Sequence, residues 1–184
     1  MVRALFPLVV VVSGLPAAGK STLSRRLASD LGLPCVSRDD IRRAVFVDHG
    51  APLHFPVEFD VAAAVDRAVG LFVSSVLDAN VGVVIDGNFN HRRHAEVVIA
   101  AIAHRDVRRA EICLWGDPYV LRARFVERAA PPLTAELEPY FDAVVNRERW
   151  TVLAQEPLAS IDSTDVRSID RQYDNILNAL RSAR

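Results

Sequence analysis

Apolar and polar residues alternate along the chain in two patterns that predict strands and helices in turn. Short valine-rich apolar runs bounded by glycine or polar residues predict buried strands. These runs fall at residues 8–13, 33–37, 81–85, 110–115 and 158–161. Between them, apolar residues recur every three or four positions, which is typical of amphipathic helices. The predicted helices fall at residues 20–31, around 41–46, and at 57–79, 91–104, 118–128, 140–153 and 169–180.

This order of elements predicts an α/β fold with a five-stranded parallel sheet and helices on both faces. The long helix 57–79 rests on apolar positions 61, 65, 68, 72 and 76. Segment 47–60 holds Gly50, Pro52 and Pro56, which predict a loop. No internal repeat or long polar linker divides the chain, so we expect a single domain over residues 1–184.

Composition narrows the class of protein. With 51% hydrophobic and 24% charged residues, the 184-residue chain has neither a disordered nor a low-complexity composition. A net charge of −1 provides no overall positive field, so nucleic acid is a possible partner but not a favoured one. Cys35 and Cys113 match neither a zinc site nor a disulfide framework. Free thiols and the lack of a membrane-spanning apolar run indicate a cytoplasmic protein.

Residues 14–22, with the sequence GLPAAGKST, match the phosphate-binding pattern G-x-x-x-x-G-K-[ST] between a predicted strand and a predicted helix. Glycines let the backbone amides converge on phosphate oxygens, and the helix directs its positive end at the same place. Lys20 would reach the β- and γ-phosphates, and the Ser21 hydroxyl would ligate Mg²⁺. The candidate nucleotide-binding residues are Gly14, Ala17, Ala18, Gly19, Lys20, Ser21 and Thr22.

Two classes of P-loop protein fit the sequence poorly. Guanine-reading switches carry an Asn-Lys-x-Asp element, but Lys20 is the one lysine of this chain. Motor and remodelling ATPases usually follow the aspartate of their third strand with a glutamate that activates water. Here Asp86 is followed by Gly87 and Asn88, so no residue at that position is suited to activating water.

Residues 37–43 follow the second predicted strand and can face the γ-phosphate, because ligands of a parallel sheet bind beyond its carboxyl ends. Phosphoryl transfer to an alcohol needs a carboxylate near the attacking hydroxyl and positive groups around the transferred group. Asp39 could accept the proton, with Asp40 as the alternative, and Arg42 could hold the acceptor. Equally, Asp39 could cap the short helix while the arginines are simply solvated.

Three sequence elements together resemble the polynucleotide-kinase-type P-loop kinases: the phosphate loop, Arg38-Asp39-Asp40-x-Arg42, and Asp86 to Asn90 followed by Arg93. That group belongs to a wider set with chloramphenicol phosphotransferase, gluconate kinase and zeta-toxin-like kinases. The resemblance implies that Asp39 is the general base and that Arg42 contacts the acceptor. It also implies that Asp86 lies beside the nucleotide and Mg²⁺, and that Asn88 and Arg93 lie on the acceptor side.

The same resemblance implies an arginine-bearing lid in region 117–133 and a backbone segment at residues 163–166 that passes around the adenine. The lid arginines of such kinases reach the triphosphate, so the resemblance implies that Arg124 and Arg128 are catalytic and that Arg124 also binds the nucleotide. Arg122 is a third candidate. Arginines at this spacing also describe a solvated helix face.

Segment 47–60 corresponds to the acceptor-binding region of these kinases, and we call it the acceptor segment. It is the least defined part of the predicted site. Its candidates include His54 beside Phe55, which could recognise a ring or a sugar, although both could be packing residues. The interval from His91 to His94 is compatible with a metal, but we identify no carboxylate or cysteine partner for such a site, so we expect the histidines at 91, 94 and 104 to lie on the surface.

The sequence thus predicts an enzyme that uses ATP and Mg²⁺ to phosphorylate a hydroxyl of a small molecule or nucleotide. One alternative is a 5′-hydroxyl polynucleotide kinase. Another is a regulatory NTPase switch with no acceptor.

Overall fold

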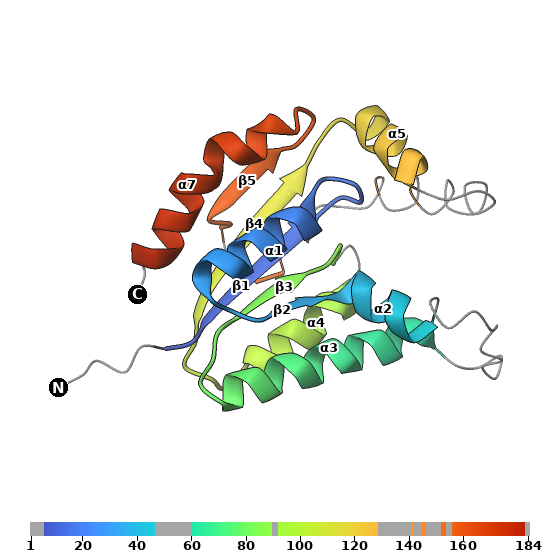
Figure 1. The fold of residues 1–184 in the computed structure, drawn as a ribbon. Coiled ribbons are helices and arrows are strands. Elements are labelled where there is room, and N and C mark those ends of the chain that lie inside the picture. The colour runs from blue at the N-terminus through green and yellow to red at the C-terminus, as the bar shows by residue number, and fades with distance from the viewer. Residues whose placement is uncertain are drawn as a thin grey trace.

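The structure is a computed structural model that describes residues 6–46, 60–89, 92–128, 141, 145, 152–153 and 156–182. Its centre is one sheet of five parallel strands in the order β2-β3-β1-β4-β5 (Figure 1). The strands are β1 (Leu8–Gly14), β2 (Cys35–Ser37), β3 (Val83–Asp86), β4 (Arg108–Trp115) and β5 (Ala159–Asp162). The predicted fold class is confirmed.

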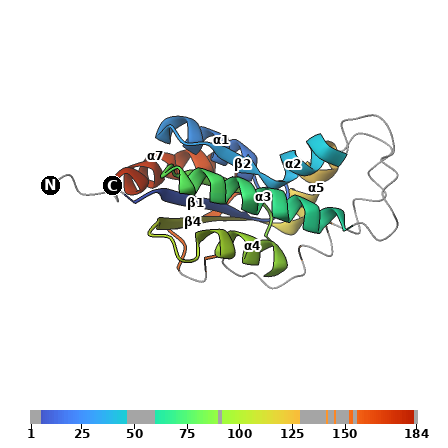
Figure 2. The ribbon, with the colours of Figure 1, turned by 90° about the horizontal axis from the view of Figure 1, so that it is seen from below.

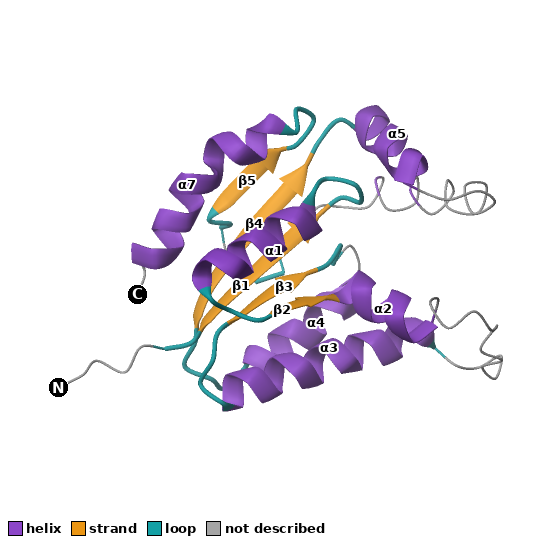
Figure 3. Cartoon of the chain, in the orientation of Figure 1, coloured by secondary structure: helices purple, strands orange, loops and turns teal. Residues whose placement is uncertain are grey.

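Helices cover both faces of the sheet (Figures 2 and 3). They are α1 (Lys20–Leu31), α2 (Arg38–Phe46), α3 (Val61–Asp78), α4 (Arg92–Ile102), α5 (Pro118–Arg128) and α7 (Arg167–Ser182). Alternate valines of β1 divide the core between two layers. Val10 and Val12 pack with α1 and α7, whereas Val9 and Val11 pack with α3 and α4. The central strand is buried on both sides because each of these valines is 0% exposed.

Two helices differ in detail from the sequence expectations. The apolar residues buried on α3 are Val65, Val69, Val73 and Leu77. Only Val65 belongs to the spacing that predicted the helix, and the other three each follow a predicted position by one residue. Phe72 is 38% exposed. The predicted helix 140–153 lies largely outside the described residues. Its described positions 141 and 145 are helical as expected, whereas its last two positions, 152 and 153, form a turn.

Two glycines and one capping aspartate mark the ends of β1 and α1 and the start of α3. Gly14 ends β1 where a Cβ would lie 1.9 Å from the Leu114 carbonyl oxygen, so only glycine permits that approach of β1 to β4. Gly32 follows the last residue of α1 with φ 64°, the left-handed conformation that glycine adopts readily at helix ends. Asp60 caps α3 by accepting from the Ala63 amide at 3.0 Å.

The carboxyl ends of the strands meet at the edge of the sheet where the phosphate loop, the start of α2 and the start of α5 also lie (Figure 1). Register places Asp86 beside both Val12 of β1 and Ser37 of β2. The candidate site residues therefore share one edge, as expected for a parallel α/β sheet. Among the described residues, no helix has the length and apolar character needed to cross a membrane.

Candidate active site

The phosphate loop joins β1 to α1 with two residues in the left-handed region. Ala17 has φ 59° and Gly19 has φ 90°. A Cβ on Gly19 would lie 2.9 Å from the Ile169 Cδ1 atom of α7, so this glycine also allows α7 to pack against the loop. Lys20 and Ser21 begin α1, whose positive end points at the loop. The backbone is thus shaped to bind an anion.

Lys20 lies inside this loop and is not on the protein surface. Lys20 is 6% exposed, and its Nζ atom donates a hydrogen bond to the Leu15 carbonyl oxygen at 2.7 Å. Burial lowers the pKa of Lys20, while the charges of Asp86 and Asp39 act in the opposite direction. The ammonium group therefore stands between the loop and two carboxylates.

Asp86 ends β3 and is 2% exposed. Burial raises its pKa, and hydrogen bonds from the Ser21 and Ser37 hydroxyls together with the Lys20 charge oppose that rise. Its Oδ1 atom has no hydrogen-bond partner among the described residues. An unsatisfied carboxylate oxygen beside a hydroxyl fits Mg²⁺, which takes one or two protein oxygens and completes its shell with phosphate and water. No larger cluster of possible metal ligands occurs in the described part of the chain.

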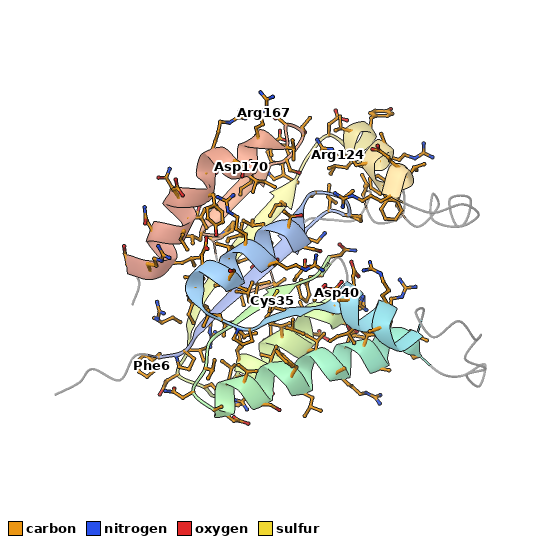
Figure 4. The ribbon with its side chains drawn as sticks, viewed as in Figure 1. Phe6, Cys35, Asp40, Arg124, Arg167 and Asp170 are labelled. Atoms are coloured by element: carbon orange, nitrogen blue, oxygen red, sulfur yellow. The ribbon has the colours of Figure 1, made fainter. Side chains whose placement is uncertain are left out.

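The first turn of α2 directs three consecutive side chains to three different places. Arg38 bonds to Asp66 of α3 at 2.7 Å. Asp40, which Figure 4 labels at the start of α2, pairs with Arg25 of α1 at 2.7 Å. Asp39 lies close enough to Lys20 and Asp86 for its charge to act on the pKa of both. Of the two aspartates that the sequence left open as the base, Asp39 is the one whose charge acts on Lys20 and Asp86, whereas Asp40 pairs with Arg25.

Asp39 does not cap α2, contrary to the alternative considered from the sequence. The helix begins at Arg38, and the Ser37 hydroxyl accepts from the Asp40 amide at 3.3 Å. Since the capping oxygen comes from Ser37, the Asp39 carboxylate is not engaged in closing its own helix end.

The other predicted acceptor-side residues are placed differently from one another. Arg42 is exposed one turn after Arg38, and Asn88 is partly buried just after β3. Arg93 donates to the Asp60 carboxylate at 3.0 Å, which ties α4 to the start of α3. His54 lies outside the described residues.

On the predicted lid, Arg124 and Arg128 have different surroundings. Arg124 donates to the Ser163 and Thr164 carbonyl oxygens at 2.7 and 2.6 Å (Figure 4), which links α5 to the segment expected near the adenine. Arg128 is exposed, and its charge acts on the pKa of Lys20. Arg122 is partly buried.

Sequence reasoning missed a buried polar group beside the start of α2. His94 was expected on the surface, but its side chain is 13% exposed and its Nδ1 atom lies 2.7 Å from the Asp66 carboxylate. That expectation was wrong, because the partner comes from α3 and lies 28 positions away in the sequence. The available signal was Asp66 itself, a charged residue within the apolar run of the predicted helix.

A phosphate loop after the central strand and a buried aspartate at the end of the neighbouring strand are typical of P-loop phosphotransferases. Residues 9–153 match the family described as AAA domain (AAA_33), and the chain belongs to that family. It is an ATP-dependent kinase of the P-loop class.

Named relatives agree with this class. A cytidylate kinase from Methanosarcina mazei is 28% identical over 169 residues, which cover 90% of this chain and 86% of the relative. One from Pyrobaculum calidifontis is 32% identical over 58% of this chain and 59% of its own.

Solved structures share the fold. A Chloroflexus aurantiacus protein, described provisionally as a kinase, has a TM-score of 0.72 at 24% identity and covers 97% of this chain and 96% of its own. A gluconokinase from Sinorhizobium meliloti has a TM-score of 0.62 at 17% identity, with the same coverage.

Proposed function

We propose that this kinase transfers the γ-phosphoryl group of ATP to a hydroxyl of a small molecule or nucleotide, with Mg²⁺ held by Ser21 and Asp86. What supports the proposal is that Asp39, in the first turn of α2, lies close enough to Lys20 and Asp86 for its charge to raise the pKa of both. In this arrangement Lys20, Ser21, Thr22 and the loop amides bind the phosphates. Asp39 takes the proton of the attacking hydroxyl, and Arg42 orients the acceptor.

The protein groups supply complementary charge along the line of transfer. Lys20 neutralises the phosphate oxygens from within the loop, and Asp39 increases the nucleophilicity of the acceptor oxygen on the opposite side. When bound, Mg²⁺ would offset the charge that develops on the β- and γ-phosphates. Asn88 and Arg93 complete the acceptor side through the segment that follows β3.

Arg128 and Arg124 close the site from the lid. Arg128 already lies near Lys20, so a small movement of α5 would bring it onto the triphosphate. Arg124 would have to exchange its bonds to the Ser163 and Thr164 carbonyls for phosphate oxygens. ATP binding and lid closure would then be coupled, which excludes water from the transferring group.

Pairing of charges on the acceptor side favours a small acceptor over a polynucleotide. Arg38 is paired with Asp66, Arg93 with Asp60, and Arg43 with Asp40 at 3.4 Å. Segment 47–59 contains neither lysine nor arginine, so it adds no cation for a phosphate backbone. Relatives named for cytidylate and gluconate, and an APS kinase from Mycobacterium tuberculosis solved with AMPPNP and APS, support acceptors of this size. His54 is our candidate for reading a ring or sugar.

The membership in the polynucleotide-kinase-type group stays a prediction, and so does its 5′-hydroxyl acceptor. The regulatory NTPase without an acceptor also stays an alternative, although Asp86 has no glutamate after it to activate water.

Replacing the proposed base tests this function. We expect Asp39→Asn to reduce MgATP-dependent phosphorylation of a hydroxyl-acceptor library by about a hundredfold or more, because the acceptor proton then has no base. MgAMPPNP affinity, measured by calorimetry, should change less than about twofold. Asp40→Asn is the matched control and should retain most activity, since its carboxylate pairs with exposed arginines. Unaltered turnover in Asp39→Asn would refute the assigned base.

A further inference from the structure

A buried ionic network joins the start of α2 to α3 and α4. Arg38 Nε donates to Asp66 Oδ1 at 2.7 Å, and His94 Nδ1 lies 2.7 Å from Asp66 Oδ2. The three side chains are 12%, 4% and 13% exposed. Burial raises the pKa of Asp66, but the hydrogen bonds from His94 and Arg38 outweigh it and hold that pKa below its usual value. Asp66 is thus a carboxylate that fixes two neighbours.

The network also reaches the end of the acceptor segment. Arg93 Nε lies 3.9 Å from Asp66 Oδ2, and its Nη1 atom donates to Asp60 Oδ2 at 3.0 Å. Asp60 caps α3 directly after segment 47–59. A continuous set of ionic contacts therefore runs from that segment to the residue that immediately precedes Asp39.

Because Arg38 and Asp39 are neighbours on one helix, the position of Arg38 determines the direction of the Asp39 side chain. Successive side chains of a helix point about 100° apart, so fixing Arg38 on one side and Asp40 on the other determines where Asp39 points. The Asp40–Arg25 pair is 43% and 61% exposed and stabilises little. The buried Arg38–Asp66 pair is the stronger constraint, because loss of one partner leaves a desolvated charge.

We propose that Asp66 is a positioning residue for phosphoryl transfer. It holds Arg38, and through Arg38 it holds the first turn of α2, so that Asp39 stays aimed at the γ-phosphate. Asp66 does not touch the substrates. This role rests on the proposed function of Asp39 as the base.

Slow hydrolysis of MgATP offers a test that needs no identified acceptor, because water takes the place of the acceptor hydroxyl. We expect Asp66→Asn to lower the hydrolysis kcat about tenfold to a hundredfold, since small misplacements of a reacting group cost this much. KM for MgATP and the affinity for MgAMPPNP should change less than about twofold. The decisive measurement is the double variant Asp39→Asn/Asp66→Asn, which should hydrolyse ATP no more slowly than Asp39→Asn alone.

The matched control is Asp78→Asn on the same helix, whose carboxylate pairs with Arg105 at 2.7 Å at the other end of α3. It should retain the hydrolysis rate. If Asp66→Asn does not fold, Arg38→Lys keeps the charge but loses the planar fork, and it should give the same non-additive loss with Asp39→Asn. Melting temperature, measured for each variant, separates instability from misplacement.

The outcomes separate the two proposals. If Asp39→Asn slows hydrolysis while neither Asp66→Asn nor Arg38→Lys does, the positioning role is wrong and the base stands. Multiplicative losses in the double variant would also overturn the positioning role, because Asp66 would then act independently of Asp39. If Asp39→Asn has no effect, both proposals fail.

Discussion

The single lysine of this chain, Lys20, lies in the phosphate loop. It is the single lysine among 22 basic residues, and its Nζ atom donates to the Leu15 carbonyl oxygen within the phosphate loop. A compact ammonium fits that space, whereas the planar guanidinium of arginine is wider and donates in fixed directions.

We therefore expect Lys20→Arg to weaken MgAMPPNP binding by about tenfold or more, as the loss of a charge-assisted hydrogen bond would. Calorimetry measures this directly. The reverse replacement at an exposed site, Arg181→Lys near the end of α7, is the control and should leave affinity unchanged, since that side chain contacts only the Asp30 carbonyl oxygen among the hydrogen bonds of the described residues. Equal affinity in Lys20→Arg would show that the loop does not require an ammonium.

The position of a residue could be predicted where a local sequence motif determines it. It could not be predicted where it depends on a partner far away in the sequence. Lys20 and Ser21 could be placed at the start of a helix and Asp86 at the end of a strand, because a loop motif and a strand end are continuous in the sequence. The burial of His94 could not be found, because it is caused by Asp66 on another helix. Our proposal of Asp39 over Asp40 as the base likewise needed the position of Arg25 on α1, which pairs with Asp40.

At the scale of elements, a buried carboxylate ties β4 to the chain that precedes β5. Glu111 is 0% exposed and accepts from the amides of Val152 and Leu153, each at 2.9 Å, and from the Ser13 hydroxyl at 2.8 Å. These bonds hold the turn at residues 152–153 against the sheet and compensate for the burial of the charge.

We expect Glu111→Gln to lower the free energy of unfolding by about 2 kcal/mol, because its amide nitrogen would face a backbone N–H that needs an acceptor. Urea denaturation measures the change. Glu96→Gln on α4 removes a 57%-exposed carboxylate paired with Arg92, and should cost less than about 0.5 kcal/mol. Equal stability of the two variants would mean that the Glu111 bonds contribute little.

Element boundaries were predicted closely where the stop signal is local. Helices α1 and α5 have the bounds that the sequence indicated, since Gly32 ends one and Pro118 opens the other. The buried face of α3 was harder, because apolar residues lie on more than one side of it and packing selects between them. Val69 and Val73 are inside, while Leu71 is 71% exposed.

For the whole molecule, the relevant quantity is how positive charge is distributed. Arginines are numerous, but several form ion pairs between distant segments, such as Arg26 with Asp170, Arg105 with Asp78, and Arg38 with Asp66. With a net charge of −1, such pairing leaves little field to attract a polyanion.

The salt dependence of oligonucleotide binding therefore separates a small-molecule kinase from a polynucleotide kinase. A groove that contacts six or more phosphates of a single strand gives a slope of log affinity against log salt of about −4 or steeper. We expect a fluorescent 5′-hydroxyl oligonucleotide to bind weakly, with a slope no steeper than about −1 between 50 and 200 mM KCl. Arg42→Gln should change that slope by less than one, because a single guanidinium accounts for at most one phosphate contact. A steep slope would restore the polynucleotide acceptor, since it would require a row of cations along the bound strand.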